Sequence, residues 1–186
     1  MEPLSVSLAH WILGEGIYAV FEAGEEYAFA LEFYAPETLR SVRRGRRAFS
    51  HRHDAQFDVV GRSTFLASDW WVIDFGVAAY TINSLPAEHK PGKLFEGSVH
   101  VGVDHGRYLE DLSRRPNSPP LFYDWRVERI EVLTGPFLDQ GKGAFLRDAD
   151  KTARSELERT VSNDPDAEYI LHCTLLDAEP RRTLRR

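Results

Sequence analysis

Six charged side chains on three predicted strands could together bind a divalent cation or carry out acid–base chemistry. The carboxylates and the histidine would supply ligands or a general base, and the arginine would orient an anion. The six residues are Asp74, His100, Asp104, Asp124, Arg126 and Glu128. Among them Asp74, Asp104 and Asp124 are the candidate ligands for Mg²⁺ or Mn²⁺, because these hard cations prefer carboxylate oxygens. Such a site would support metal-assisted phosphohydrolysis.

The alternation of side chains along a strand is what would bring these groups together. Successive side chains point to opposite faces, so apolar residues at alternate positions identify the core side. In two of the strands this core side is clear, and it consists of Val99, Val101, Val103, Tyr123, Trp125 and Val127. The charged residues then fall on the opposite face, where Gly76 and Gly102 would leave room for a ligand.

Asp74 lies in the run Trp70–Ile82, which is apolar on both faces and is typical of a central strand. A carboxylate in such a strand must be paired, hydrogen-bonded or protonated. Asp74 therefore belongs either to the predicted site or to a structural ion pair with Arg126. The sequence leaves both interpretations open.

The segment Arg40–His53 is the second candidate site, with six arginines and no acid. A guanidinium group can donate two parallel hydrogen bonds to a phosphate, and an aromatic ring can stack on a base. The candidate ligand-binding residues are Arg43, Arg44, Arg46, Arg47 and Phe49. The alternative is a mobile solvated loop, or a loop folded back onto the acidic body of the protein.

The rest of the molecule is acidic. The chain has 29 acidic and 23 basic residues, and ten of the basic ones are arginines in the segments 40–53 and 180–186. Without these ten, thirteen basic residues remain against 29 acidic ones, a balance of −16. Such a body repels a long polyanion. A short RNA or a nucleotide therefore suits the basic segment better than duplex DNA.

The sequence predicts one β-rich domain over residues 1–179, followed by a basic C-terminal tail over 180–186. Strands are expected over Trp11–Glu22, Tyr27–Tyr34, Gln56–Ala67, Trp70–Ile82, Leu94–Val103, Leu121–Leu133 and Glu168–Leu176, with long loops over Ala35–Ala55 and Asp104–Pro120. A four-residue apolar spacing predicts one helix over Asp148–Ser162. The fold class is mainly β (α+β): a six- or seven-stranded antiparallel barrel or strongly curved sheet, OB-like or SH3-like, capped by this helix. An α+β sandwich is the alternative.

A cytoplasmic location is expected. Cys173 is the one cysteine, so no internal disulfide can form, which fits a reducing compartment. The first residues lack the layout of a signal peptide, and no apolar run reaches the roughly 18 residues of a membrane-spanning helix. No membrane association is expected.

Three functions are compatible with these features. The leading one is a non-catalytic module that binds a short single-stranded nucleic acid or a phosphorylated small molecule through the 40–53 loop and the rim of the sheet. The second is the metal-dependent phosphohydrolase described above. The third is an acidic protein-interaction or inhibitor domain that meets a basic protein partner.

Overall fold

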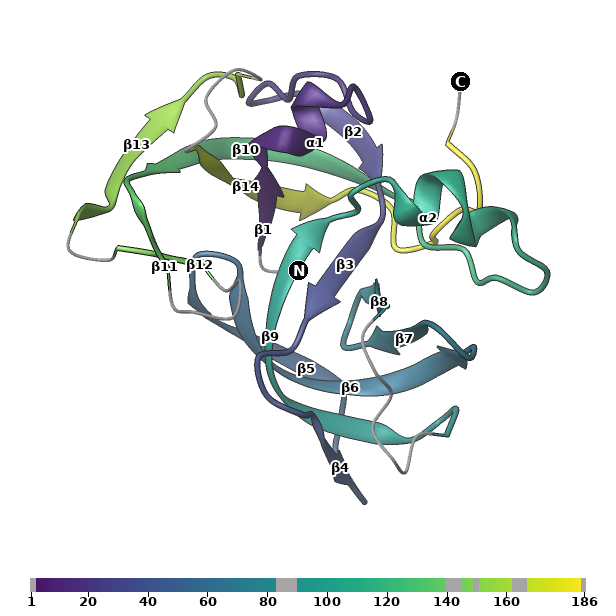
Figure 1. Cartoon of the computed structure of the whole chain (residues 1–186). Helices are drawn as coiled ribbons and strands as arrows, with labels where there is room; N and C mark the ends of the chain where they lie inside the picture. Colours follow the sequence, from purple (N-terminus) through teal and green to yellow (C-terminus); the bar gives the residue numbers. More distant parts are fainter. Residues whose placement is uncertain (1–2, 83–89, 140–144, 149–150, 162–166, 185–186) are drawn as a thin grey trace.

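The computed structural model describes residues 3–82, 90–139, 145–148, 151–161 and 167–184 (Figure 1). The structure is mainly β, with 52% strand and 8% helix, which confirms the predicted fold class at that level. One 12-stranded sheet contains most of the strands, and five of them close into a barrel. None of the helices among the described residues has the length and apolar character that crossing a bilayer requires.

The barrel forms because the long strand β9 pairs with two different partners along its length. Its first part pairs with β6 and its last part pairs with β3, so the sheet curves back on itself. Around the barrel the strands are β9 (Leu94–Val103), β3 (Leu31–Tyr34), β8 (Ala78–Thr81), β7 (Trp71–Asp74) and β6 (Gln56–Leu66). Val99, Val101 and Val103 of β9 are buried, as the alternation predicts. The barrel has five strands rather than six or seven.

A second group of strands, which we call the arm, extends the sheet away from the barrel (Figure 1). It consists of β1 (Leu4–Ala9), β14 (Glu168–Leu175), β10 (Tyr123–Thr134), β13 (Ala153–Leu157) and β2 (Glu26–Phe29). The arm joins the barrel where β1 runs parallel to β9, with Ser7 opposite Gly102. Tyr123, Trp125 and Val127 of β10 are buried, again as predicted.

Four short strands complete the β structure. On the outside of the barrel, β4 (Arg40–Val42) pairs with β9 and β5 (Ala48–His53) pairs with β6. A separate hairpin consists of β11 (Phe137–Asp139) and β12 (Phe145–Arg147). The predicted loop Ala35–Ala55 therefore contains two strands.

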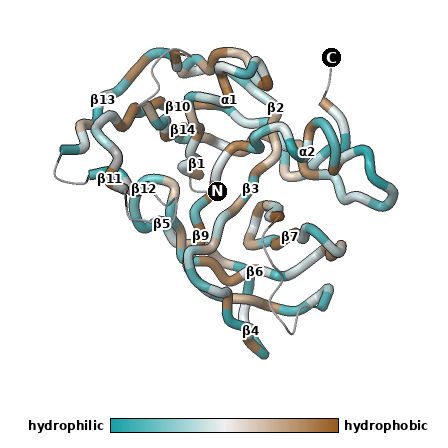
Figure 2. Tube along the Cα trace, in the orientation of Figure 1, coloured by the Kyte–Doolittle hydropathy of each residue, from teal (hydrophilic) through white to brown (hydrophobic). Residues whose placement is uncertain are grey.

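One continuous hydrophobic core fills the barrel and continues under the arm. In the arm, Phe29 stacks on Trp125 with ring centroids 5.6 Å apart. A smaller cluster around Trp70 and Tyr108 lies beneath α2 (Arg107–Glu110) and the 3₁₀ turn Leu112–Arg114. These two short helices lie in the predicted loop Asp104–Pro120, and the loop that follows α2 is largely hydrophilic (Figure 2).

The predicted helix over residues 148–162 is wrong. Among the described residues of that segment, Ala153–Leu157 form β13, which pairs with β10. Of the described apolar residues that suggested a helix, Val161 is 41% exposed, whereas Leu157 is partly buried against the core. The edge of β10 presents backbone groups that need partners, and pairing with them outweighs the weak helix preference of the segment.

Three predicted strands also differ from the structure. The segment Tyr27–Tyr34 is divided into β2, which pairs with β10, and β3, which pairs with β8 and β9. The segment Trp11–Glu22 includes part of the short helix α1 (His10–Gly14), whose residues Ile12 and Leu13 are buried. The run Trp70–Ile82 is divided into β7 and β8 by a tight turn, where Gly76 adopts a φ of +130°. That conformation favours glycine and places Asp74 at the end of a strand rather than in its middle. The predicted strands at β6, β9, β10 and β14 are confirmed.

Candidate functional site

The residues Arg43–Arg47, here called the arginine turn, connect β4 to β5 on the outside of the barrel. Arg43, Arg44 and Arg46 are exposed, and none of them has a carboxylate partner among the described residues. Arg47 differs, because its guanidinium group forms an ion pair with Asp74. The turn therefore presents three solvent-facing cations, while the fourth supports the β7–β8 turn.

The neighbouring arginines are neutralised by the acidic body. Arg40 forms an ion pair with Glu96 at 3.0 Å, and Arg52 forms one with Asp58 at 2.6 Å. Most arginines elsewhere in the described chain also pair with a carboxylate, namely Arg107, Arg115, Arg126, Arg129, Arg147, Arg154 and Arg181. The arginine turn is thus a concentration of uncompensated positive charge.

Phe49, the residue predicted to stack on a base, packs into the wall of the barrel. Its half-buried ring packs edge-on against Phe57 and Phe75, with centroids 5.9 Å away in both cases. A ring held on two sides by other rings is part of the core of the barrel wall. Phe49 also lines the hollow described next, so its base-stacking role stays a prediction.

A hollow of about 360 Å³ lies between β4 and β5 over the outer face of β6 and β9. Its wall includes Ala48, Val60 and the Arg40–Glu96 ion pair. The arginine turn borders it, because a Cβ atom placed on Gly45 would lie 3.2 Å from Cγ1 of Val60. A ligand in the hollow could therefore have its phosphate contacted by the turn.

The structure does not bring together the six residues of the predicted catalytic site. Asp74 lies beside Arg47 and accepts a 3.0 Å hydrogen bond from the backbone N–H of Gly76. Asp124 forms an ion pair with Arg181 of the C-terminal tail. The Asp74, Asp104 and Asp124 carboxylates thus have separate partners, and they do not form a cation-binding group among the described residues. Nothing in this arrangement supports a shared Mg²⁺ or Mn²⁺ ion.

The predicted site fails mainly because β10 does not lie beside β9, since β14 and β1 lie between them; the alternation along β10 holds as far as Val127, where a β-bulge follows. Arg126 pairs with Glu26 at 2.6 Å, whereas Glu128 is the extra residue of a bulge and is exposed. Beyond the bulge the faces exchange, so Arg129 and Glu131 face His172 while the intervening apolar residue is buried. A bulge of this kind moves every following side chain to the other face.

Asp104 belongs to a different group of polar residues at the end of β9. Its ligand atoms lie within 4.8 Å of those of Glu32 and His105, a spacing that could in principle hold a metal ion. Asp104 is fully buried, however, and already accepts hydrogen bonds from the hydroxyls of Tyr18 and Tyr80 and from the backbone N–H groups of residues 108 and 109. Its acceptor capacity is filled, so its role is structural.

The imidazole of His105 forms a hydrogen bond with Glu32, and this bond raises the pKa of His105 above its ordinary value. A ring nitrogen that donates to Glu32 carries a proton and cannot ligate a metal at the same time, which is a second argument against a cation in this group. Glu32 and His105 are instead joined by this hydrogen bond. Trp11 packs near it, with ring centroids 5.9 Å from His105.

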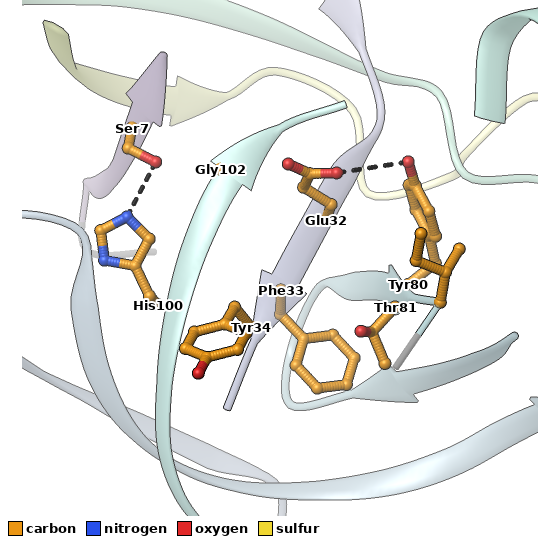
Figure 3. Close-up of a pocket in the computed structure, with 9 residues that line it drawn as sticks. Ser7, Glu32, Phe33, Tyr34, Tyr80, Thr81, His100 and Gly102 are labelled. Carbon is orange, nitrogen blue, oxygen red and sulfur yellow. Dashed lines mark hydrogen bonds between the residues drawn. The ribbon is translucent and has the colours of Figure 1, made fainter. Parts of the chain in front are cut away.

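His100 lines a cavity of about 160 Å³ where β1, β3 and β9 meet (Figure 3). Its Nε2 lies 2.9 Å from the hydroxyl oxygen of Ser7, and burial lowers the pKa of His100, so the imidazole is neutral near pH 7. Glu32 and Tyr34 of β3 form the opposite wall. Gly102 lies between the two walls, which fits its predicted place on a ligand-facing surface, whereas Gly76 is in the β7–β8 turn.

The sequence matches no protein-family model. Comparisons with curated proteins and with solved structures also found no match. The site must therefore be interpreted from its own geometry.

Sequence reasoning missed Ser7 and Glu32. Ser7 lies in β1, a strand that the sequence pattern does not predict, and Glu32 lies in a predicted strand whose neighbours the sequence does not reveal. Only the pairing of β9 with β1 and with β3 places both residues beside Gly102. The one sequence feature that points to Glu32 is the alternation over Leu31–Tyr34, which places Glu32 and Tyr34 on the same face of the strand.

Proposed function

We propose that this protein is a cytoplasmic ligand-binding module that holds the phosphate of a short single-stranded nucleic acid or of a phosphorylated small molecule at the arginine turn. The observation that carries this proposal is the exposure of Arg43, Arg44 and Arg46 without carboxylate partners among the described residues, in a chain that pairs most of its arginines. These like charges repel one another by about 1 kcal/mol or less per pair in water, and a bound anion would relieve this repulsion.

The shape of the surroundings supports a small ligand. The hollow beside the turn has room for a nucleoside-sized group, and its wall combines the apolar side chains of Ala48 and Val60 with polar edges. Proteins of the OB type bind oligonucleotides on an outer face of a five-stranded barrel, and the location of the turn is analogous. Beyond the turn, Asp58 and Glu96 make the surface mixed in charge, which disfavours a long nucleic acid.

Binding of fluorescently labelled oligonucleotides and of a labelled nucleoside triphosphate, followed by fluorescence anisotropy, tests the proposal. We expect the affinity to fall with added salt, since each phosphate contact releases counterions. Replacing Arg43, Arg44 and Arg46 together by glutamine should weaken binding by about 100-fold, because each arginine–phosphate hydrogen bond contributes roughly 1 kcal/mol to the binding free energy.

The matched control replaces Arg114, Arg159 and Arg182 by glutamine. These exposed arginines also lack a carboxylate partner among the described residues, but they lie on different elements. The control removes the same net charge from the molecule, so it separates a local contact from the long-range field. Equal decreases in affinity in the two triple variants, or no salt-dependent binding of either ligand class by the wild type, would overturn the proposal.

A further inference from the structure

Two hydrogen-bond acceptors face one another across Gly102 in the cavity formed by β1, β3 and β9 (Figure 3). The single proton of the Ser7 hydroxyl goes either to Nε2 of His100, 2.9 Å away, or to the backbone C=O of Val101, 3.4 Å away, and in both arrangements Oγ keeps at least one free lone pair. The Tyr80 hydroxyl, whose proton is donated to Asp104, and the His105 imidazole both contact Glu32 at the same oxygen, Oε2. The Oε1 atom has no protein partner among the described residues, and the carboxylate oxygen not bonded to Tyr80 points toward Gly102 (Figure 3).

The missing side chain of Gly102 is what makes both acceptors accessible to one ligand. A Cβ atom placed there would lie 3.1 Å from Oγ of Ser7 and 3.7 Å from Cγ of Glu32. A ligand positioned over this glycine can therefore contact both side chains at once. Because both contacts accept hydrogen bonds, the ligand must present two neighbouring donors.

The charges around the cavity favour an uncharged donor. Oε2 of Glu32 is already bound by His105, and this hydrogen bond is the main cause of the raised pKa of His105. His100 contributes no charge, since burial lowers its pKa. A cation would compete with His105 for the Glu32 carboxylate, whereas hydroxyl groups would gain two free acceptors.

The Ser7–His100 pair also has the components of a nucleophile and its base. The carboxylate of Glu32, however, lies on the other side of Gly102 from Ser7. It would oppose the negative charge that develops on a carbonyl oxygen under attack by Ser7. The arrangement therefore favours binding over acyl transfer.

The size and the mouth of the cavity suit a single ring. Its volume of about 160 Å³ is close to that of a cavity able to hold one benzene molecule, roughly 150 Å³. Tyr34 lines the cavity and is 57% exposed, so its ring is available to pack against the C–H face of a ligand. Thr81 and Tyr80 add further hydroxyl groups to the wall.

We propose that this cavity, beside Gly102, binds one ring of a saccharide, with two adjacent hydroxyl groups donating hydrogen bonds to Ser7 and Glu32. This site is separate from the phosphate site at the arginine turn and does not depend on it. A sugar ring offers what the cavity requires, namely vicinal donors on an uncharged six- or five-membered ring with an apolar face.

Titration of ¹⁵N-labelled protein, followed by amide chemical shifts, tests the inference. The probes are D-glucose, D-ribose, cis-1,2-cyclohexanediol as the minimal diol, cyclohexanol, guanidinium and uracil. We expect saturable, millimolar binding of a monosaccharide and weaker binding of the diol, with shifts centred on Gly102 and Tyr34. Cyclohexanol should bind at least about tenfold more weakly than the diol, because one of its donors is missing.

Variants of the wall locate the site. Gly102→Ala and Glu32→Gln should each weaken sugar binding about tenfold, and Ser7→Ala provides a second test that adds no atoms to the cavity. Glu37→Gln removes an exposed carboxylate outside the cavity and should have no effect. The triple arginine variant should also bind the sugar normally, which separates this result from that of the phosphate site.

Three results would overturn the inference: no binding of any sugar or of the diol, tighter binding of guanidinium or uracil than of the sugars, or sugar binding unchanged by both Ser7→Ala and Glu32→Gln. Each variant is first compared with the wild type for its dispersion of amide shifts. A decrease in affinity is therefore interpreted only for variants that are folded.

Discussion

The Tyr80 hydroxyl donates a 2.5 Å hydrogen bond to Asp104, a carboxylate with no solvent exposure. Asp104 also accepts hydrogen bonds from the N–H groups of Tyr108 and Leu109, at 2.9 and 3.0 Å. One side chain thereby joins β8 of the barrel to α2 and to the end of β9. The proximity of Asp104, together with burial, raises the pKa of Tyr80, so the phenol stays protonated and remains a donor.

The first prediction concerns this buried carboxylate. Asp104→Asn keeps the shape of the side chain but replaces one acceptor by an NH₂ group, which would face donors. We expect the free energy of unfolding to fall by about 2–4 kcal/mol, the range for leaving buried donors unsatisfied. Urea unfolding at neutral pH measures the change.

Asp58→Asn is the control, because Asp58 forms an ion pair with Arg52 in which both side chains are about half exposed. Such a pair contributes roughly 0–1 kcal/mol. If the two variants were destabilised equally, Asp104 would not be the link between β8 and α2.

The second prediction concerns the pH dependence that His105 contributes. The hydrogen bond to Glu32 raises the pKa of His105 above its ordinary value of 6.5, so the folded state binds this proton more tightly than the unfolded chain. The resulting stability is fully present below the unfolded pKa and is lost as the pH rises through the folded value. His105→Gln should therefore lose more stability in mildly acidic than in mildly alkaline buffer.

The measurement is the difference in unfolding free energy between wild type and His105→Gln across this pH range. Taking the difference removes the contributions of His100 and His172, whose pKa values are lowered by burial and which have the opposite pH dependence. A difference that grew toward alkaline pH would contradict the Glu32–His105 ion pair.

The sequence predicts the strands well where the alternation is regular and uninterrupted. The positions of β9 and β10 follow from their buried valines and aromatics, and Cys173 is buried in β14 as its neighbours indicate. The prediction fails where tertiary pairing decides the structure. The apolar residues in and around 153–157 have a helical spacing, but residues 153–157 pair with the free edge of β10 and form a strand.

The candidate site is harder to predict because it depends on the order and pairing of the strands. The predicted site required β10 to lie beside β9, whereas β14 and β1 lie between them, and local sequence patterns do not reveal this strand order. The alternation along β9 places His100 and Gly102 on one cavity-lining face, but their partners Ser7 and Glu32 come from strands whose pairing with β9 cannot be predicted from local patterns. The arginine turn, by contrast, is a local feature, and its exposure follows from its charge.

The third prediction separates packing from ligand binding at Phe49. Because its ring packs against Phe57 and Phe75, Phe49→Ala should lower the free energy of unfolding by about 2 kcal/mol, less than for a fully buried phenylalanine. Oligonucleotide or nucleotide affinity should remain within about twofold of wild type under conditions where the variant is folded. Thermal unfolding and fluorescence anisotropy measure the two effects, and a large decrease in affinity with unchanged stability would support the base-stacking role.

The last prediction concerns Arg154, which anchors β13 to the rest of the arm. Its guanidinium group lies 2.5 Å from Oε2 of Glu131 and also pairs with Asp54 at the β5–β6 turn. Burial alone would raise the pKa of Glu131, but hydrogen bonds from His172, Arg154 and Arg129 outweigh it and lower the pKa. Arg154→Gln should cost about 1–3 kcal/mol at neutral pH, since two other donors remain on this carboxylate.

The destabilisation caused by Arg154→Gln should decrease as the pH falls through the pKa of Glu131. A carboxyl group whose pKa is lowered in the folded state contributes stability above its unfolded pKa of 4.5, and this contribution is lost in acid. A double-mutant cycle with Glu131→Gln measures the coupling, and we expect at least about 1 kcal/mol. Arg52→Gln, in an exposed pair, should show little pH-dependent change. A coupling near zero between Arg154 and Glu131 would mean that β13 is not held against β10 by this contact.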